Sequence, residues 1–174
     1  MTDAPEPATL TPAQLPPVAR EVFRDGMACL AGAVNIVTTD GPGGRSGFTA
    51  SAVCSVTDQP PTLLVCLNRG SSAAAAFAGN EGLCVNTVGP DHHDLAMLFG
   101  GKTPMADRFA ASAWHSGASG APVLEGAVVS FDCRIAQRHV VGTHEVMFCE
   151  VVGVETRPGA ASVWFGRRFH ELRA

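Results

Sequence analysis

The chain has 174 residues, of which 46% are hydrophobic, and its formal net charge at pH 7 is −4. This length suits one domain around one hydrophobic core, so a second independent domain is not expected. The 12 Lys and Arg residues are scattered along the chain, which excludes the basic patch of a nucleic-acid-binding protein, and we expect neither DNA nor RNA as a partner.

The N-terminal region does not resemble a targeting signal. Residues 1–17 are rich in Pro, Ala and Thr and carry acids rather than a basic region followed by an apolar one, so a signal peptide is not expected. No apolar run approaches membrane-spanning length. The six cysteines occur singly, without a C-x-x-C pair or a His at zinc-ligand spacing, which indicates reduced, buried side chains and no metal site. Together these features predict a soluble cytoplasmic protein.

Residues 1–16 are expected to form a disordered leader, because four prolines interrupt any periodic pattern. The domain would then comprise residues 17–174. It opens with a predicted helix from Pro17 to a stop at Gly32, whose apolar face we expect to pack against a sheet. That face consists of Val18, Val22, Phe23, Met27 and Leu30.

The remaining apolar segments are short, β-branched and separated by Gly, Pro or Asp, as is typical of strands. They cover residues 33–39, 48–57, 62–68, 82–88, 127–137, 140–141, 145–154 and 162–165. Residues 129–135 alternate between apolar and polar, which indicates a strand with one exposed face. Residues 146–154 are mostly apolar on both faces. A strand of that kind favours a barrel with helices or a second subunit packed outside it.

Three short helices are expected between the strands, at residues 72–78, 91–99 and 106–111, with Asp91 as the N-cap of the second. The order of elements is not a repeated strand–helix–strand pattern, so a doubly wound sheet is disfavoured. The sequence thus predicts a mainly β domain with flanking helices.

Three incomplete motifs argue against other reaction classes. Residues 41–46 end in Ser where a dinucleotide fingerprint needs Gly, and a hairpin turn is the better interpretation. Residues 101–103 copy the end of a P-loop, but residue 96 is Ala and a proline follows. His144 and Glu145 would open a zincin motif, yet residue 148 is Phe. His92 and His93 point about 100° apart on a helix, so we expect exposed residues of a capping turn rather than metal ligands.

Residues 47–58 carry small and hydroxylated side chains where a core strand would carry bulk. Their backbone amides, with the hydroxyls of Thr49, Ser51 and Ser55, could approach a polar planar ligand closely. A tightly packed strand of small residues explains the same pattern equally well. Ser71 and Ser72 come after a strand and open a short helix, where they could bind a phosphate or simply cap the helix.

Residues 47–68 resemble the short-chain flavin reductases, which are the reductase components of two-component flavin monooxygenases. The similarity continues through residues 68–72, 83–87, 99–105, 108–109, 122–125, 129–135, 141–144 and 163–165. It covers nearly all of residues 23–170. The resemblance implies an FMN-binding split β-barrel that forms a homodimer, with each flavin near the subunit boundary.

The resemblance also implies a set of site residues. Contacts to FMN, with FAD as the alternative, fall to Thr49, Ala50, Ser51, Ala52, Ser55, Cys66, Asn68, Ser71 and Ser72. Lys102, Arg108 and Arg69 are candidates for the counter-charges of the phosphate, although Lys102 and Arg108 could equally be solvated surface charges. His144 is implied to position NADH, with a structural, hydrogen-bonded histidine as the alternative. Thr143 precedes it where many flavin reductases have Asp, so no carboxylate acts there.

The implied reaction is hydride transfer from NADH to FMN, after which the reduced flavin leaves for a separate monooxygenase. Within the family the chain is most similar to the reductase of the pyrimidine-utilisation pathway. The reductase partnered with 4-hydroxyphenylacetate 3-monooxygenase is the nearest enzyme alternative. A non-catalytic flavin- or haem-binding split-barrel module is the alternative from another class, because a fold does not fix a function.

Overall fold

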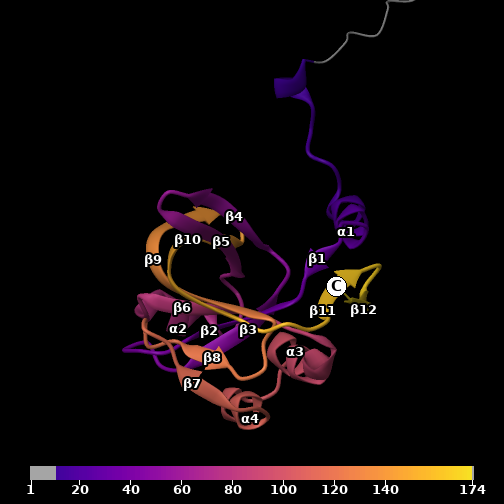
Figure 1. Ribbon diagram of the computed structural model, residues 1–174. Coiled ribbons are helices and arrows are strands. Elements are labelled where there is room, and N and C mark those ends of the chain that lie inside the picture. The colour runs from indigo at the N-terminus through magenta and orange to yellow at the C-terminus, as the bar shows by residue number, and fades with distance from the viewer. Residues whose placement is uncertain (1–10, 174) are drawn as a thin grey trace, which may run out of the picture.

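The computed structural model describes residues 11–173. Its main sheet has seven antiparallel strands in the order β3-β2-β6-β9-β10-β5-β4 (Figure 1). These strands are β2 (Asn35–Thr39), β3 (Ser46–Ala50), β4 (Val53–Asp58), β5 (Pro61–Asn68), β6 (Gly82–Thr87), β9 (Val129–Val141) and β10 (His144–Thr156). The expected mainly β fold is confirmed.

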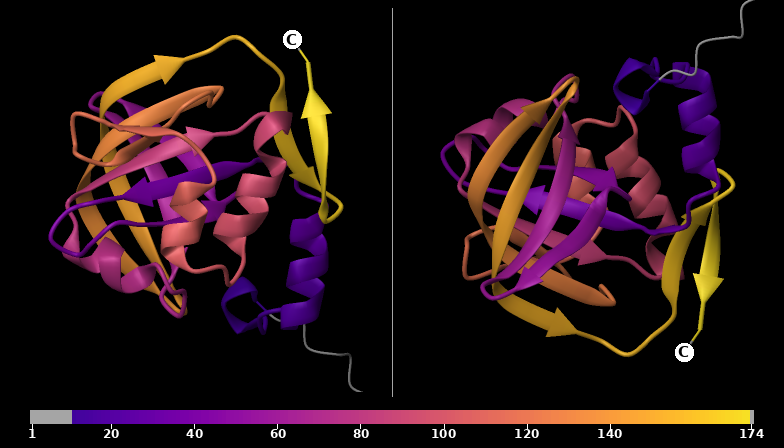
Figure 2. Two further views of the ribbon diagram at one scale, coloured as in Figure 1. Left: turned by 90° about the horizontal axis from the view of Figure 1, so that it is seen from below. Right: turned by 90° about the horizontal axis from the view of Figure 1, so that it is seen from above.

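The sheet is strongly curled because of how its two edge strands are connected. β3 and β4 occupy opposite edges, yet only Ser51 and Ala52 separate them in the chain. The two edges must therefore approach each other, and Figure 2 shows the sheet wrapped around its interior. Among the described strands β3 pairs only with β2 and β4 only with β5. The barrel is thus open along the seam between β3 and β4.

Smaller elements surround this sheet. β1 (Gly32–Ala33), β11 (Ala161–Phe165) and β12 (Arg168–Leu172) form a second sheet, and β7 (Trp114–Ser116) pairs with β8 (Pro122–Leu124). The helices are α1 (Arg20–Ala28), α2 (Ala74–Gly79), α3 (His93–Gly100) and α4 (Met105–Ala110), with 3₁₀ turns at Pro12–Gln14 and Pro90–His92. No helix among the described residues is both long and apolar enough to cross a membrane.

The core lies on both faces of β2. Val37 packs inside the curled sheet with residues such as Phe77 of α2, whereas Ile36 packs outward under α3 with Phe99. Every residue of β2 is buried. For residues 146–154 the sequence predicted two buried faces, covered by helices or by a second subunit, and within the described residues of one chain no helix supplies that cover. Val152 and Val154 of β10 are 51% and 54% exposed, because no helix covers that part of the sheet.

A buried amide cross-links four strands. Asn86 of β6 is fully buried, and its Nδ2 donates to the Ile36 carbonyl oxygen and to Thr38 Oγ1, at 3.0 and 3.2 Å. Its Oδ1 accepts from the Leu124 amide and from Ser130 Oγ, at 2.8 and 2.9 Å. An unpaired buried amide would cost about 1–3 kcal/mol per group. This network therefore explains why a buried strand carries an Asn next to its C-terminal residue.

Helix α1 is present as expected, but it does not pack against a sheet. None of its residues is buried, and Val22 and Phe23 are 60% and 59% exposed. In Figure 1 it stands beside β1 and away from the main sheet. Its end is held by the Gly166 amide, which donates to the Ala28 carbonyl oxygen at 2.8 Å, and by an ion pair between Arg167 and Asp25.

Several element boundaries differ from the sequence prediction. The strand expected at residues 48–57 is divided by Ser51 and Ala52, whereas the runs 127–137 and 140–141 belong to one strand, β9. The short strands β7, β8 and β12 were not expected. Most of the expected leader, residues 1–10, lies outside the described residues, and residues 12–14 form a 3₁₀ turn.

Two expectations about the helix at residues 91–99 were wrong. Asp91 lies within a 3₁₀ turn, and the N-cap position of α3 is His92, so Asp91 is not the N-cap. His93 is not an exposed capping residue, because its ring stacks on Phe169 with centroids 4.1 Å apart and its Nε2 lies 2.6 Å from Ser162 Oγ. The histidine thereby fastens α3 to the second sheet.

The six cysteines are all free, but they are not all buried. Cys84, Cys133 and Cys149 are buried as expected, while Cys29 and Cys54 are exposed. Burial raises the pKa of the Cys149 thiol to about 12, and it raises the pKa of Cys84 and of Cys133 as well. These three thiols are therefore protonated at neutral pH and act as small apolar side chains.

Candidate functional site

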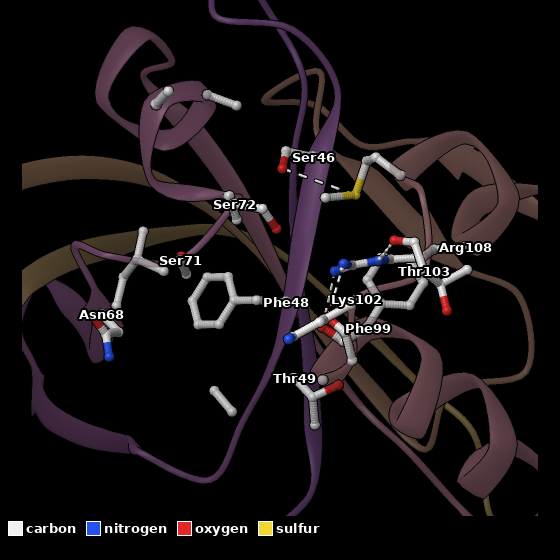
Figure 3. Close-up of a pocket in the computed structure, with 18 of the residues that line it drawn as sticks. Ser46, Phe48, Thr49, Asn68, Ser71, Ser72, Phe99, Lys102, Thr103 and Arg108 are labelled. Carbon is white, nitrogen blue, oxygen red and sulfur yellow. Dashed lines mark hydrogen bonds between the residues drawn. The ribbon is translucent and has the colours of Figure 1, made fainter.

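A cavity of about 950 Å³ lies beside the seam of the barrel. The lining comes from β3 and its link to β4, from the end of β5 with the start of α2, and from the turn between α3 and α4 (Figure 3). All but two of the site residues predicted from the sequence line it, namely Thr49, Ala50, Ser51, Ala52, Cys66, Asn68, Ser71, Ser72, Lys102, Arg108 and His144. Segments more than 90 residues apart in sequence thus meet at one site.

The exceptions are Ser55 and Arg69. Ser55 lies on exposed β4 opposite Leu63 and is not part of the cavity wall. Arg69 is likewise exposed and outside the lining. Both residues lie close in sequence to lining residues, but the alternating direction of strand side chains and the turn after β5 carry them away.

Strand β3 offers its free edge to the cavity, since it pairs on one side only. Apart from Phe48 its side chains are small, and Ser51 and Ala52 beyond it are exposed. Thr49 Oγ1 donates to the Ala96 carbonyl oxygen at 2.5 Å, which ties α3 to this edge. The hydroxyl proton of Thr49 is therefore used within the protein, and only its oxygen lone pairs and nearby backbone groups remain available to a ligand.

Ser71 provides the clearest sign that the cavity suits a polar ligand. Its Oγ is buried and has no hydrogen-bond partner among the described residues, although it lines the cavity. Buried polar groups are nearly always paired, so an orphaned hydroxyl at a cavity wall needs an explanation. The adjacent turn is rigid, because the Ser71 and Gly70 amides donate to the backbone carbonyl oxygen and to Oδ1 of Asn68, at 3.0 and 2.8 Å.

Arg108 is neither a surface charge nor a free counter-charge. It is only 3% exposed, and its Nε donates to the Thr103 carbonyl oxygen at 2.7 Å. Its Nη1 and Nη2 donate to the carbonyl oxygens of Phe99 and Gly101, at 3.1 and 3.0 Å. The guanidinium therefore satisfies carbonyls at the C-terminal end of α3, a role that the sequence did not predict.

Lys102 belongs to the same turn but faces the cavity. It is exposed, forms no ion pair among residues 11–173, and in Figure 3 its ammonium points toward Phe48 across the open space. Of the three cations considered in the sequence, only this one lies in the cavity wall with its charge uncommitted.

His144 stands at the mouth of the cavity. It is the first residue of β10 and pairs with Asn68 of β5. Its Nδ1 lies 2.9 Å from Thr143 Oγ1, so the preceding threonine makes a hydrogen bond to the ring. The side chain is exposed, which leaves room for a second molecule to approach.

Cys66 lines the cavity as expected, and it is joined to the seam by its amide, which donates to the Ala52 carbonyl oxygen at 3.1 Å. Burial, and to a smaller extent the neighbouring Cys54, raises the pKa of the Cys66 thiol. The thiol is therefore a neutral part of the wall rather than a nucleophile.

Several lining residues were missed by reasoning from the sequence. Phe48 lies in the middle of the cavity wall and packs edge to face on Phe77, 5.1 Å between centroids. Others missed are Gly43, Arg45, Ser46, Phe99, Gly100, Gly101, Thr103, Pro104 and Met105. Residues 99–105 carry much of the family resemblance, and that signal could have identified the missed residues within this segment, but not Gly43, Arg45 or Ser46.

A second cavity of about 350 Å³ adjoins the first and shares Thr49, Ala50 and Ser51 with it. Its far wall is aromatic and consists of Trp164 and Phe169, whose rings are 5.0 Å apart. The two cavities together make an elongated site, polar at the Ser71 end and apolar at the Trp164 end.

This arrangement fits a flavin mononucleotide. The volume lies within the usual range for small-molecule sites. The unpartnered Ser71 hydroxyl and the free Lys102 ammonium suit a phosphate, and the open edge of β3 suits the polar edge of a planar ring. Within the described residues no cluster of His, Cys, Asp or Glu could hold a metal ion.

Comparison with known proteins agrees with this fit. Residues 27–173 match the model of the flavin reductase like domain. The chain is 60% identical over 157 residues to the FMN reductase (NADH) RutF of Stutzerimonas stutzeri (strain A1501), covering 90% of each chain. It is 58% identical over 157 residues to the protein of the same name in Escherichia coli (strain K12 / DH10B), covering 89% of this chain and 95% of that one.

Solved structures give the same result. A protein described as a flavin reductase from Haemophilus somnus superposes with a TM-score of 0.86 at 42% identity, over 89% of this chain and 100% of that one. The NADH:FAD oxidoreductase SgcE6 of Streptomyces globisporus, solved with NAD and FAD fragments, gives a TM-score of 0.81 at 25% identity, over 88% of this chain and 92% of that one. The resemblance inferred from the sequence is therefore confirmed, and the chain belongs to the flavin reductase family.

Proposed function

We propose that this protein is an NADH-dependent FMN reductase that supplies reduced flavin to a separate monooxygenase in pyrimidine degradation. The observation that carries the proposal is the cavity at the barrel seam, with an orphaned Ser71 hydroxyl in its wall. The 60% identity to an FMN reductase (NADH) over 90% of the chain favours FMN over the FAD alternative. The free, unpaired cysteines fit action in the cytoplasm.

In this proposal the residues divide by position. The β3 edge with Ser51 and Ala52 holds the ring, while Asn68, Ser71, Ser72 and Lys102 hold the phosphate. When bound, FMN supplies the redox chemistry by accepting a hydride from NADH. The protein needs only to hold the flavin and to leave one face open, and His144 at the cavity mouth orients the nicotinamide there.

The test of the reaction is NADH oxidation by purified protein, followed by the loss of NADH absorbance, with and without added FMN. We expect rapid oxidation that depends on FMN and on the protein. Absence of turnover with NADH or NADPH, despite demonstrated flavin binding, would favour the non-catalytic binding module. A Soret band in the purified protein would indicate haem instead.

Ser71→Ala tests the phosphate subsite. We expect the Kd for FMN to rise about 10- to 100-fold, because a hydrogen bond to a charged group contributes about 1.5–3 kcal/mol. The Kd for riboflavin, which lacks the phosphate, should not change. The ligand-free variant should be at least as stable as the wild type, since the lost hydroxyl has no partner. Flavin fluorescence titration and thermal unfolding provide both measurements.

Ser116→Ala is the matched control, because Ser116 is exposed and lies outside the cavity. It should change neither affinity nor stability. A Ser71→Ala variant that binds FMN as tightly as the wild type would contradict the assignment of Ser71 to the phosphate.

His144→Gln tests the positioning of NADH. We expect KM for NADH to rise roughly tenfold while the Kd for FMN stays unchanged, since the histidine would orient the nicotinamide rather than hold the flavin. His139→Gln, an exposed histidine of the neighbouring strand outside the cavity, is the control. Weaker FMN binding with unchanged KM would assign His144 to the flavin instead.

We further propose a homodimer in which a second copy covers α1. Helix α1 buries none of its apolar face, and a cavity of about 800 Å³ between α1 and β1 includes Ser51 and Ala52. Those two residues also line the proposed flavin site, so a partner seated there would lie beside the flavin.

Val22→Glu tests this interface. Burying a Val side chain contributes about 1.5–3 kcal/mol, and symmetry applies the loss twice, so the dimer should weaken by at least about 100-fold. Sedimentation equilibrium would report the change. Arg20→Gln, a polar change on the same helix, is the control. A Val22→Glu dimer of wild-type strength would show that α1 is not in the interface.

A further inference from the structure

The acceptors of the Arg108 hydrogen bonds lie on both sides of Lys102 in the chain. The guanidinium binds the carbonyl oxygens of Gly101 and Thr103, at 3.0 and 2.7 Å, and these residues stand immediately before and after Lys102. A third bond, to the Phe99 carbonyl oxygen at 3.1 Å, joins this turn to α3. One buried side chain therefore fixes the backbone on both sides of the only uncommitted cation that the described residues place in the cavity wall.

The turn has few other restraints. It contains two consecutive glycines, and Gly100, Gly101 and Lys102 are all exposed. Outside regular helices, one backbone amide of residues 100–104 donates a hydrogen bond to another backbone group of the described residues. It is the Gly101 amide, which donates to the Leu98 carbonyl oxygen at 3.1 Å. Glycine-rich segments sample many conformations when unrestrained. Without the guanidinium, the Lys102 ammonium would be spread over many positions.

Arg108 also differs from the other arginine that closes a helix. Arg138 donates to the Phe77 and Asn80 carbonyl oxygens at the end of α2, both at 2.8 Å, and has Glu145 as a counter-ion at 3.0 Å. Arg108 has no carboxylate partner among residues 11–173, and only carbonyl dipoles surround it. Its guanidinium makes four hydrogen bonds from three nitrogens, and a lysine at this place, with a single nitrogen, could not reproduce them.

We propose that Arg108 is a positioning residue that brackets Lys102 and aims its ammonium at the flavin phosphate, without touching the phosphate itself. This inference rests on the proposed function, because it needs a phosphate in the cavity. It predicts that the contribution of Lys102 to binding exists only while the turn is fixed. The quantity that reports it is the ratio of the Kd for riboflavin to the Kd for FMN, since the two ligands differ only in the phosphate.

The experiment is a double-mutant cycle of Arg108→Lys and Lys102→Met, with FMN and riboflavin titrated against each variant. Lys102→Met should lower the ratio at least about tenfold, as expected for loss of a charge-assisted bond. Arg108→Lys keeps the charge but loses the fork, and it should lower the ratio by a similar factor. The ratio for the double variant should be no lower than the lower of the two ratios measured for the single variants.

Arg138→Lys is the matched control, because it disturbs an equivalent helix end outside the cavity lining. It should lower the thermal midpoint to a similar extent while leaving the ratio unchanged. If Arg108→Lys does not fold, Arg108→Gln, which retains two N–H donors, takes its place in the cycle.

Four results would overturn the proposal. In the first, Arg108→Lys leaves the ratio unchanged. In the second, the effects of the two substitutions on the ratio multiply in the double variant, which would mean that Arg108 contributes independently of Lys102. Loss of riboflavin binding together with FMN binding would show a general structural role instead. A wild type that binds FMN no tighter than riboflavin would remove the phosphate subsite, and the NADH oxidation assay would then decide separately whether the protein is a reductase.

Discussion

The site depends on the two-residue connection between β3 and β4. Two residues span only about 10 Å between their flanking neighbours even when fully extended, yet the strands that they join stand at opposite edges of a seven-stranded sheet. The sheet has to curl until these edges nearly meet. That closure brings the end of β5, the start of α2 and the turn after α3 around one cavity, and it leaves the β3 edge without a strand partner.

Much of this could be predicted from the sequence. Short β-branched runs marked most strands, and the small residues after Gly47 marked the cavity wall that Thr49 and Ala50 provide. The family resemblance was needed to choose a ligand site over a tightly packed strand. Side-chain type alone could not make that choice, because small residues serve both purposes.

The errors share one physical cause. A periodic pattern gives the apolar face of an element but not what covers that face, so the apolar side of α1 was assigned to the sheet although it is exposed. For the same reason the two buried faces of β2 were not predicted. The partners of Arg108 left no signal at all, because they are backbone carbonyls, which every residue carries.

The open seam has a consequence for ligand exchange. A closed barrel can widen only by breaking hydrogen bonds between neighbouring strands, and each such opening competes with the stability of the whole sheet. Here β3 and β4 do not pair with each other. Opening of the seam between them would leave the pairing of β3 with β2 and of β4 with β5 intact. Displacing the link of Ser51 and Ala52 would break the bond from the Cys66 amide to the Ala52 carbonyl oxygen but no pairing between β3 and β4. If the cavity holds a flavin, as we propose, the ligand could exchange without unfolding of the sheet.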